Sequence, residues 1–209
     1  MNNQSASGRT WTSIEDLRLE VLRCNKCGLS SSRTQVVFGD GSPVSRIMIV
    51  GEAPGRDEDK SGKPFVGLAG RGLNRVLEMA GLARERVWVT NVVRCRPTVM
   101  RDASVCNRAP RASEIKACDP WMAAEVECIV PEVIVCVGLV AGRALISNCF
   151  DLLGTSPILR SSKFGIPAVA TYHPAYMARV SRADKPVIER HMVEAFVLAR
   201  SVVSKCCGV

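Results

Sequence analysis

Four short and mostly apolar runs limit the fold of this chain more than any other feature of its sequence. The runs are Ile47–Val50, Val87–Thr90, Val133–Val137 and Ala168–Thr171. Strands with one wet face alternate apolar and polar residues, whereas strands buried on both faces carry continuous apolar runs. The four runs therefore predict a parallel sheet that is covered by helices on both faces.

Apolar residues at helical spacing lie between and after these runs. They are Leu73, Val76, Leu77 and Ala80; Ile115, Met122, Val126 and Ile129; and Ile188, Met192, Phe196 and Ala199. An earlier helix is expected to begin at the capping-box sequence Thr12-Ser13-Ile14-Glu15 and to end near Cys24. Strands that alternate with helices define an α/β fold, in which ligands bind at the carboxyl ends of the strands.

The chain of 209 residues has no repeat and no long linker, so we expect one domain over residues 1–209, with a flexible tail over 1–12. The first residues lack the cationic start and apolar stretch of a secretory signal, which predicts a cytoplasmic protein. The longest apolar region, 129–146, contains Pro131, Glu132 and Arg143, and this composition excludes a membrane span.

The chain is basic, with 28 Lys and Arg against 20 Asp and Glu, a formal charge of +8. Such a charge favours a polyanionic partner, either nucleic acid or an anionic membrane surface, although a protein can also be basic without one. A segment with Arg160, Lys163 and Arg179 also contains Tyr172 and Tyr176, and this mixture suits a phosphate backbone with bases close by.

Ten cysteines in a reducing compartment indicate metal or cluster ligation, or buried thiols, before disulfides. The pair Cys24-x-x-Cys27 lies in a loop rich in Gly and Ser and is compatible with zinc, an iron-sulfur cluster or redox chemistry. Cys95 and Cys118 lie in two other segments of the chain, and folding could bring them to one cluster together with this pair. The cysteines that lie in apolar runs are interpreted as buried apolar residues; they are Cys128, Cys136 and Cys149.

Polar residues follow three of the predicted strands, namely Glu52, Asn91 and His173. Phe65 lies in a glycine-flanked loop, where a flat ring could stack on a ligand. The acidic run 57–59 fits a solvated loop and makes a poor phosphate cradle, because carboxylates repel phosphate.

In their order along the chain, these segments resemble the family-4 uracil-DNA glycosylases, the iron-sulfur branch of the uracil-DNA glycosylase superfamily. The resemblance covers roughly Cys24 to Met177. The segments that carry it are Cys24-x-x-Cys27 with Arg33-Thr34; Gly51-Glu52-Ala53-Pro54-Gly55; Pro64-Phe65-Val66-Gly67; Thr90-Asn91-Val92-Val93-x-Cys95-Arg96-Pro97; Glu114-x-x-x-Cys118; and His173-Pro174.

The resemblance implies a three-layer α/β fold with a four-stranded parallel sheet, and a [4Fe-4S] cluster on Cys24, Cys27, Cys95 and Cys118. It implies that the protein flips uracil out of single- or double-stranded DNA and hydrolyses its N-glycosidic bond. We expect the protein to be a monomer. The DNA would be bound by Arg160, Lys163, Tyr176 and Arg179.

The same resemblance assigns roles in the pocket. Phe65 would stack on uracil, the Asn91 amide would read its hydrogen-bonding edge, and His173 would donate to the uracil oxygen that becomes negative. Glu52, or secondly Glu58, would stabilise the sugar cation and orient water. Ala53 would line the uracil site.

Three departures from the family pattern bear on these roles. Ala53 stands where other branches have a water-activating Asp or Asn, and Ala175 replaces a serine. An insert, Val99–Asn107, contains Cys106, which could replace Cys95 as a ligand. A related branch captures the abasic site through a histidine in this insert, and residues 97–109 contain none. Two alternatives remain: a DNA-damage-binding or abasic-site-trapping member of the fold, and a redox iron-sulfur protein.

Overall fold

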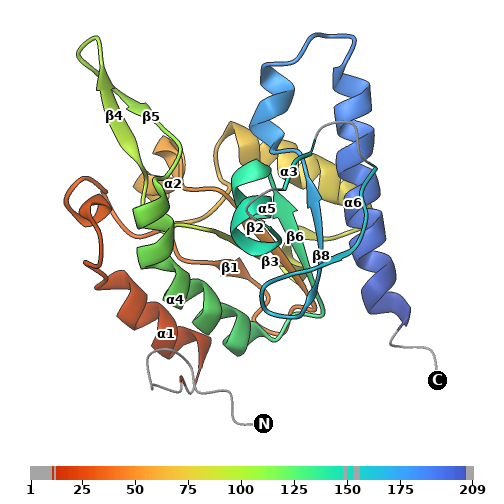
Figure 1. The fold of residues 1–209 in the computed structure, drawn as a ribbon, viewed down its shortest axis with the longest axis horizontal. Coiled ribbons are helices and arrows are strands. Elements are labelled where there is room, and N and C mark those ends of the chain that lie inside the picture. The colour runs from red at the N-terminus through yellow and green to blue at the C-terminus, as the bar shows by residue number, and fades with distance from the viewer. Residues whose placement is uncertain (1–10, 12, 148–149, 153–155, 206–209) are drawn as a thin grey trace.

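A central sheet forms the middle layer of the molecule (Figure 1). The computed structural model describes residues 11, 13–147, 150–152 and 156–205. Four parallel strands lie in the order β3 (Trp88–Asn91), β2 (Ile47–Gly51), β6 (Val133–Val137) and β8 (Pro167–Thr171). These are the four predicted runs, and their parallel pairing confirms the predicted fold class.

The sheet has six strands and not four, because a short antiparallel strand lies at each edge. Strand β1 (Asp40–Gly41) pairs with β3, and β7 (Arg160–Ser161) pairs with β8. Each has only two residues, too few to produce an apolar pattern in the sequence.

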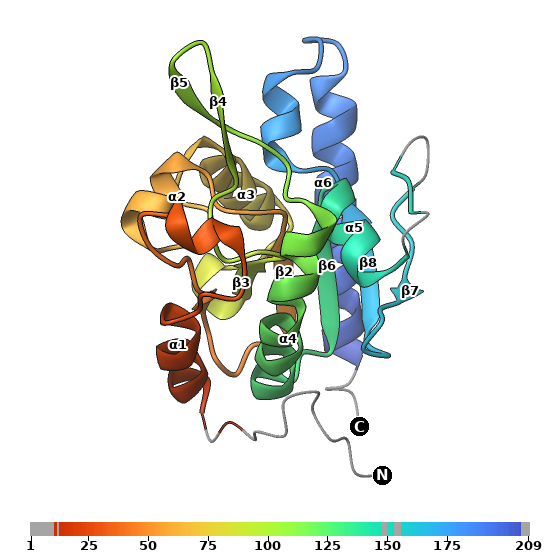
Figure 2. The same cartoon turned by 60° about the vertical axis from the view of Figure 1, so that its left-hand side comes forward.

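Helices cover both faces of the sheet, and strand residues alternate between two cores (Figure 2). Helices α1 (Ile14–Leu22), α4 (Ala112–Ile129) and α5 (Leu139–Leu145) pack on the face that carries Met48 and Val50. Helices α3 (Leu68–Met79) and α6 (Lys185–Lys205) pack on the face of Ile49. Three short 3-10 helices, η1 (Gly28–Ser31), η2 (Arg84–Arg86) and η3 (Pro174–Ala178), complete the connections.

The start of the first helix differs from the expectation. Ser13 caps α1, because its hydroxyl accepts from the Asp16 amide at 3.1 Å. Thr12 and the expected tail lie outside the described residues, except for Trp11, whose ring centroid is 6.2 Å from that of Trp121.

The acidic run was interpreted wrongly as a solvated loop, since it begins helix α2 (Arg56–Ser61). Glu58 and Asp59 are buried. The Asp59 carboxylate accepts from the Thr34 amide at 2.9 Å and the Thr34 hydroxyl at 2.7 Å, which ties α2 to the N-terminal loop. Partners that lie 25 residues away in sequence hold this carboxylate, so its own neighbours give no sign of its burial.

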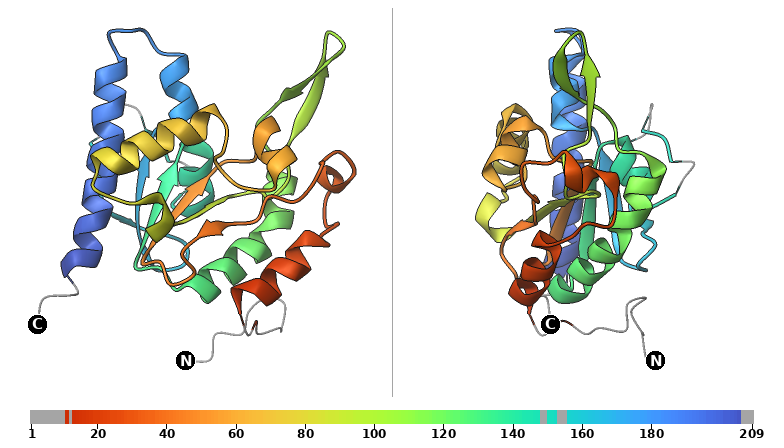
Figure 3. Two further views of the ribbon diagram at one scale, coloured as in Figure 1. Left: turned by 180° about the vertical axis from the view of Figure 1, so that it is seen from behind. Right: turned by 90° about the vertical axis from the view of Figure 1, so that its left-hand side faces the viewer.

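The insert forms a hairpin that the sequence reading did not predict. Strands β4 (Thr98–Arg101) and β5 (Ser104–Asn107) pair antiparallel and are separate from the central sheet. The hairpin projects from the same side of the molecule as η3 and the start of α6 (Figures 1 and 3). In the described part of the chain, no helix combines the length and apolar character that crossing a membrane requires.

Candidate active site and four-cysteine pocket

Three of the predicted site residues meet at the carboxyl ends of the strands. Gly51 ends β2, and a methyl group on its Cα would lie 2.4 Å from the Phe65 ring and 2.5 Å from the Asn91 Oδ1. The ring centroids of Phe65 and His173 are 5.9 Å apart. The backbone at Gly51 thus leaves room for an aromatic face, an amide and an imidazole around one point.

The loop that carries Phe65 is held by Glu58. One Glu58 oxygen accepts from the amides of Val66 at 3.0 Å and Gly67 at 2.8 Å, and the other accepts from the Gly55 amide at 3.1 Å. Phe65 itself has a φ of 55°, a left-handed conformation that the surrounding contacts must hold. One Glu58 oxygen therefore positions the Phe65 loop, and the other holds the start of α2 at Gly55.

His173 is neutral at physiological pH and has a defined tautomer. Burial, and secondly the charge of Arg179, lowers the pKa of His173 to about 4. Its Nδ1 accepts a hydrogen bond from the Ala175 amide at 3.2 Å, so the ring proton lies on Nε2. The ring can donate a hydrogen bond without carrying a charge.

Glu52 follows Gly51 at the end of β2 and is partly buried. Burial raises the pKa of its carboxyl, and the positive charge of Arg179 opposes that rise. Ala53 is also partly buried and packs against the core on the α4 face. The site therefore contains one carboxylate whose ionised state depends on a nearby arginine.

The four predicted DNA-binding residues do not form one group. Tyr176 lies in η3 and Arg179 directly follows it, so both are close to His173 at the start of this helix. The ring of Tyr176 stacks on that of Tyr172, with the ring centroids 5.5 Å apart. Arg160 pairs with Ala168 near the start of β8, so Arg160 lies at the opposite end of that strand from His173. Lys163 lies near the same end and forms an ion pair with Asp119 of α4.

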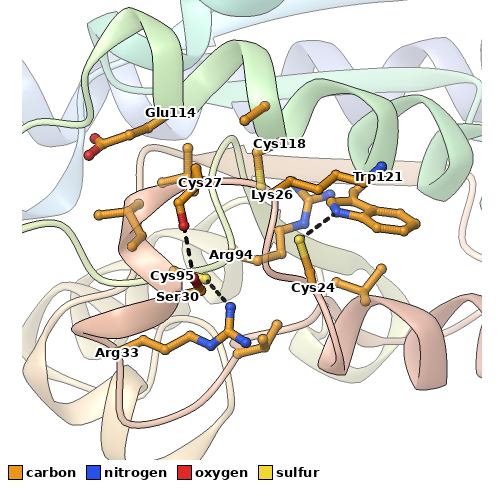
Figure 4. A pocket seen from close by; sticks show the side chains of 15 residues that line it. Cys24, Lys26, Cys27, Ser30, Arg33, Arg94, Cys95, Glu114, Cys118 and Trp121 are labelled. Atoms are coloured by element: carbon orange, nitrogen blue, oxygen red, sulfur yellow. Dashed lines mark hydrogen bonds between the residues drawn. The ribbon is translucent and has the colours of Figure 1, made fainter.

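The four predicted cysteine ligands line one pocket (Figure 4). Cys24 and Cys27 lie between α1 and η1, Cys95 follows β3, and Cys118 lies on α4. Cys106 lies on β5 and is not among the residues that line the pocket, so the structure favours Cys95.

Positively polarised groups surround the sulfur atoms of this pocket. Arg33 donates to the Cys95 Sγ at 3.2 Å, and the Trp121 indole donates to the Cys24 Sγ at 3.1 Å. Burial raises the pKa of Cys95 to about 11, and Arg33 opposes that rise. These donors favour thiolates, the form that binds metals.

The set of thiols that lines the pocket bears on which metal group it fits. A single ion holds each thiolate about 2.3 Å from one centre. Within the described residues, no three His, Cys, Asp or Glu side chains are placed to share one ion. A [4Fe-4S] cluster takes one thiolate at each iron and so spreads its ligands, and four thiols around one pocket fit this group.

A buried ion pair, which the sequence did not predict, lies between the cysteine pocket and the end of β3. The Arg94 guanidinium pairs with Glu125, donates to the carbonyl of Val92 at 3.1 Å, and lines the cysteine pocket. Glu125 also accepts from the Trp88 indole at 2.9 Å and from the Thr90 hydroxyl at 3.1 Å. The partners lie 31 to 37 residues apart in sequence, and no local motif signals such a network.

The family model described as "Uracil DNA glycosylase superfamily" matches residues 38–197, a range that includes Phe65, Asn91 and His173. This chain belongs to the uracil-DNA glycosylase superfamily. A type-4 uracil-DNA glycosylase of Archaeoglobus fulgidus is 40% identical over 171 residues, 78% of this chain and 82% of the relative. One of Thermotoga maritima is 36% identical over 203 residues, 92% of this chain and 95% of the relative.

A second branch of the superfamily matches more weakly. A type-5 uracil-DNA glycosylase of Thermus thermophilus is 29% identical over 157 residues, 66% of this chain and 68% of the relative. The type-4 relatives are more similar over more of the chain, and the chain therefore groups with the type-4 uracil-DNA glycosylases, as the sequence motifs indicated.

Proposed function

We propose that this protein removes uracil from DNA by hydrolysing the bond between the base and its sugar. The observation that carries the proposal is the meeting of Phe65, Asn91 and a neutral His173 around Gly51. The type-4 names of relatives that cover most of the chain support the same reaction.

The first step is recognition of an extruded base, since the reacting atoms are inaccessible within a stacked duplex. Phe65 offers a ring face to uracil, Ala53 lines the pocket, and the Asn91 amide pairs with the polar edge that differs between uracil and cytosine. Asn91 is buried. A base that leaves this amide unpaired loses about 1–3 kcal/mol of binding.

The second step breaks the bond between the sugar C1′ and the base N1, and the electron pair leaves with uracil. The Nε2–H of His173 donates to the uracil oxygen where negative charge develops, which stabilises the transition state. The Glu52 carboxylate faces the sugar cation and orients a water molecule. The water hydroxyl bonds to C1′, the remaining proton neutralises the uracil anion, and the products are free uracil and an abasic site.

DNA contacts are assigned first to Tyr176 and Arg179, because they lie beside His173. Arg160 and Lys163 would contact DNA only at a distance from the pocket, along the edge next to β7. The protein would act as a monomer in the cytoplasm, and its charge of +8 would make its affinity for DNA fall steeply with salt.

The proposal includes a [4Fe-4S] cluster held by Cys24, Cys27, Cys95 and Cys118. Its support is the pocket that the four cysteines share and the donors from Arg33 and Trp121. When bound, the cluster supplies a covalent tie between the N-terminal loop, the segment after β3 and helix α4. The hydrolysis itself is carried out by the residues of the pocket.

The test is incubation of the purified protein with a uracil-containing oligonucleotide, followed by denaturing separation with and without alkali. Strand breaks that appear only after alkali, together with free uracil, are the expected result. A covalent protein–DNA product would instead support the abasic-site-trapping alternative. Intact DNA under all conditions would instead support a DNA-damage-binding or a redox protein. The variant Glu52→Gln, which deletes the charge proposed to face the sugar, serves as the low-activity reference.

A further inference from the structure

The tip of the β4–β5 hairpin exposes two apolar side chains on one face. Met100 and Val105 are directly opposite each other in the register, and they are 63% and 56% exposed. The neighbouring pair on the other face, Val99 and Cys106, is half-buried. The exposed pair belongs to neither hydrophobic core of the described residues. An apolar cross-strand pair in water gains free energy when a partner covers it.

The hairpin is held firmly at its base. Arg96 donates to the Asn107 side chain at 2.7 Å. Arg108 donates to the Thr98 carbonyl at 3.0 Å and to both oxygens of Glu114, at 2.8 and 2.6 Å. Glu114 in turn accepts from the Arg111 amide at the start of α4. The tip is therefore a projection with a fixed base.

Its position and charge indicate the kind of partner. The hairpin begins seven residues after Asn91 and projects from the same side of the molecule as η3, which carries Tyr176 (Figures 1 and 3). Residues 96–111 contain four arginines and one acidic residue, Asp102, and Arg101 is exposed beside the apolar pair. An apolar tip with a cation beside it complements stacked bases flanked by phosphates.

We propose that the hairpin is a second DNA-contacting element, which packs Met100 and Val105 against base pairs that flank the extruded nucleotide and places Arg101 on a phosphate. This inference rests on the proposed function. A substrate that fills the pocket from a duplex meets the hairpin and η3 together, whereas a very short single strand reaches only the pocket. The hairpin therefore favours duplex substrates over short ones.

The test compares two identical substitutions at exposed valines. Val105→Thr keeps shape and strand preference but removes apolar character at the tip, and Val44→Thr does the same at a position that is 83% exposed before the start of β2. Binding to a duplex with an abasic-site analogue and uracil excision from a five-nucleotide single strand are measured for each. Melting temperatures and circular dichroism check the fold of every variant.

We expect Val105→Thr to weaken duplex binding about threefold and Met100→Thr/Val105→Thr about tenfold, with excision from the five-nucleotide strand unchanged. Val44→Thr leaves both unchanged. Arg101→Gln lowers the slope of log affinity against log salt by about one. Parental duplex affinity in the double variant, or an equal loss on both substrates, overturns the role of the hairpin. If the parental protein excises no uracil from the five-nucleotide strand, the proposed function fails instead.

Discussion

Arg94 donates from Nη1 to the carbonyl oxygen of Asn91 at 2.6 Å, while the same guanidinium lines the cysteine pocket. The residue proposed to read uracil is thus held by a side chain that also borders the proposed cluster site. Arg94 and Glu125 are 1% and 0% exposed and form an ion pair away from water.

Glu125→Gln leaves the Arg94 charge buried without its carboxylate. We expect the free energy of unfolding to fall by about 3–5 kcal/mol in urea titrations. The control is Glu132→Gln, which removes the carboxylate of the Arg46–Glu132 pair, 36% and 35% exposed, and should cost less than about 1 kcal/mol. Equal losses in the two variants would contradict the prediction.

Gly51→Ala places a methyl group between Phe65 and Asn91, where it would lie about 2.5 Å from both. Uracil excision should fall at least a hundredfold in single-turnover assays, because the ring and the amide must move apart. Gly28→Ala is the control, since a methyl group there meets nothing within 4 Å. Full activity in Gly51→Ala would show that uracil binds elsewhere.

His173 should make the protein less stable at acidic pH, because its pKa is lower in the folded protein than in the unfolded chain. Its pKa is about 4 in the folded protein and about 6.5 in an unfolded chain, so below pH 6.5 the unfolded state takes up a proton that the folded state refuses. The free energy of unfolding therefore falls as pH drops from about 6.5 to 4. In urea titrations at pH 7 and 4.5, the loss should be larger for the parental protein than for His173→Gln.

We expect Arg179 to influence the acid limb of the activity profile through Glu52. Its charge lowers the pKa of Glu52 against the effect of burial, and Glu52 acts as a carboxylate in the proposed mechanism. Arg179→Gln should therefore move the acid limb of kcat/KM to higher pH. Arg182→Gln, three residues further along the chain, should leave the position of that limb unchanged.

We expect the purified protein to be brown from its cluster, and Cys24→Ala should abolish this colour and the iron content, because it removes one of the four thiolates. The parental protein should contain about four iron and four sulfide per chain. Cys106→Ala is the matched control and should retain all the iron, since Cys106 lies on the hairpin outside the pocket. Zinc in place of iron in the parental protein would exclude the cluster.

The sequence was sufficient to predict the parallel strands and the residues at their ends, because burial on both faces imposes continuous apolar runs and ligands collect where such strands stop. The burial of Glu58 was not predicted, because this carboxylate is held by backbone amides eight and nine residues further on, and no side-chain pattern in the sequence indicates such bonds.

The hairpin escaped prediction for another reason. Its turn places Asp102 and Ala103 at φ values of 45° and 63°, where Asn and Gly are the usual signals. Its sequence alone does not mark it.

The two-residue strands β1 and β7 have a consequence for how this protein behaves at high concentration. A parallel sheet with open edges offers unpaired amides and carbonyls to any neighbouring chain, and long flat edges lead to aggregation. Here each edge ends after two residues, with Asp40 on one side and Arg160 on the other. Another copy of the chain finds too little backbone to extend the sheet.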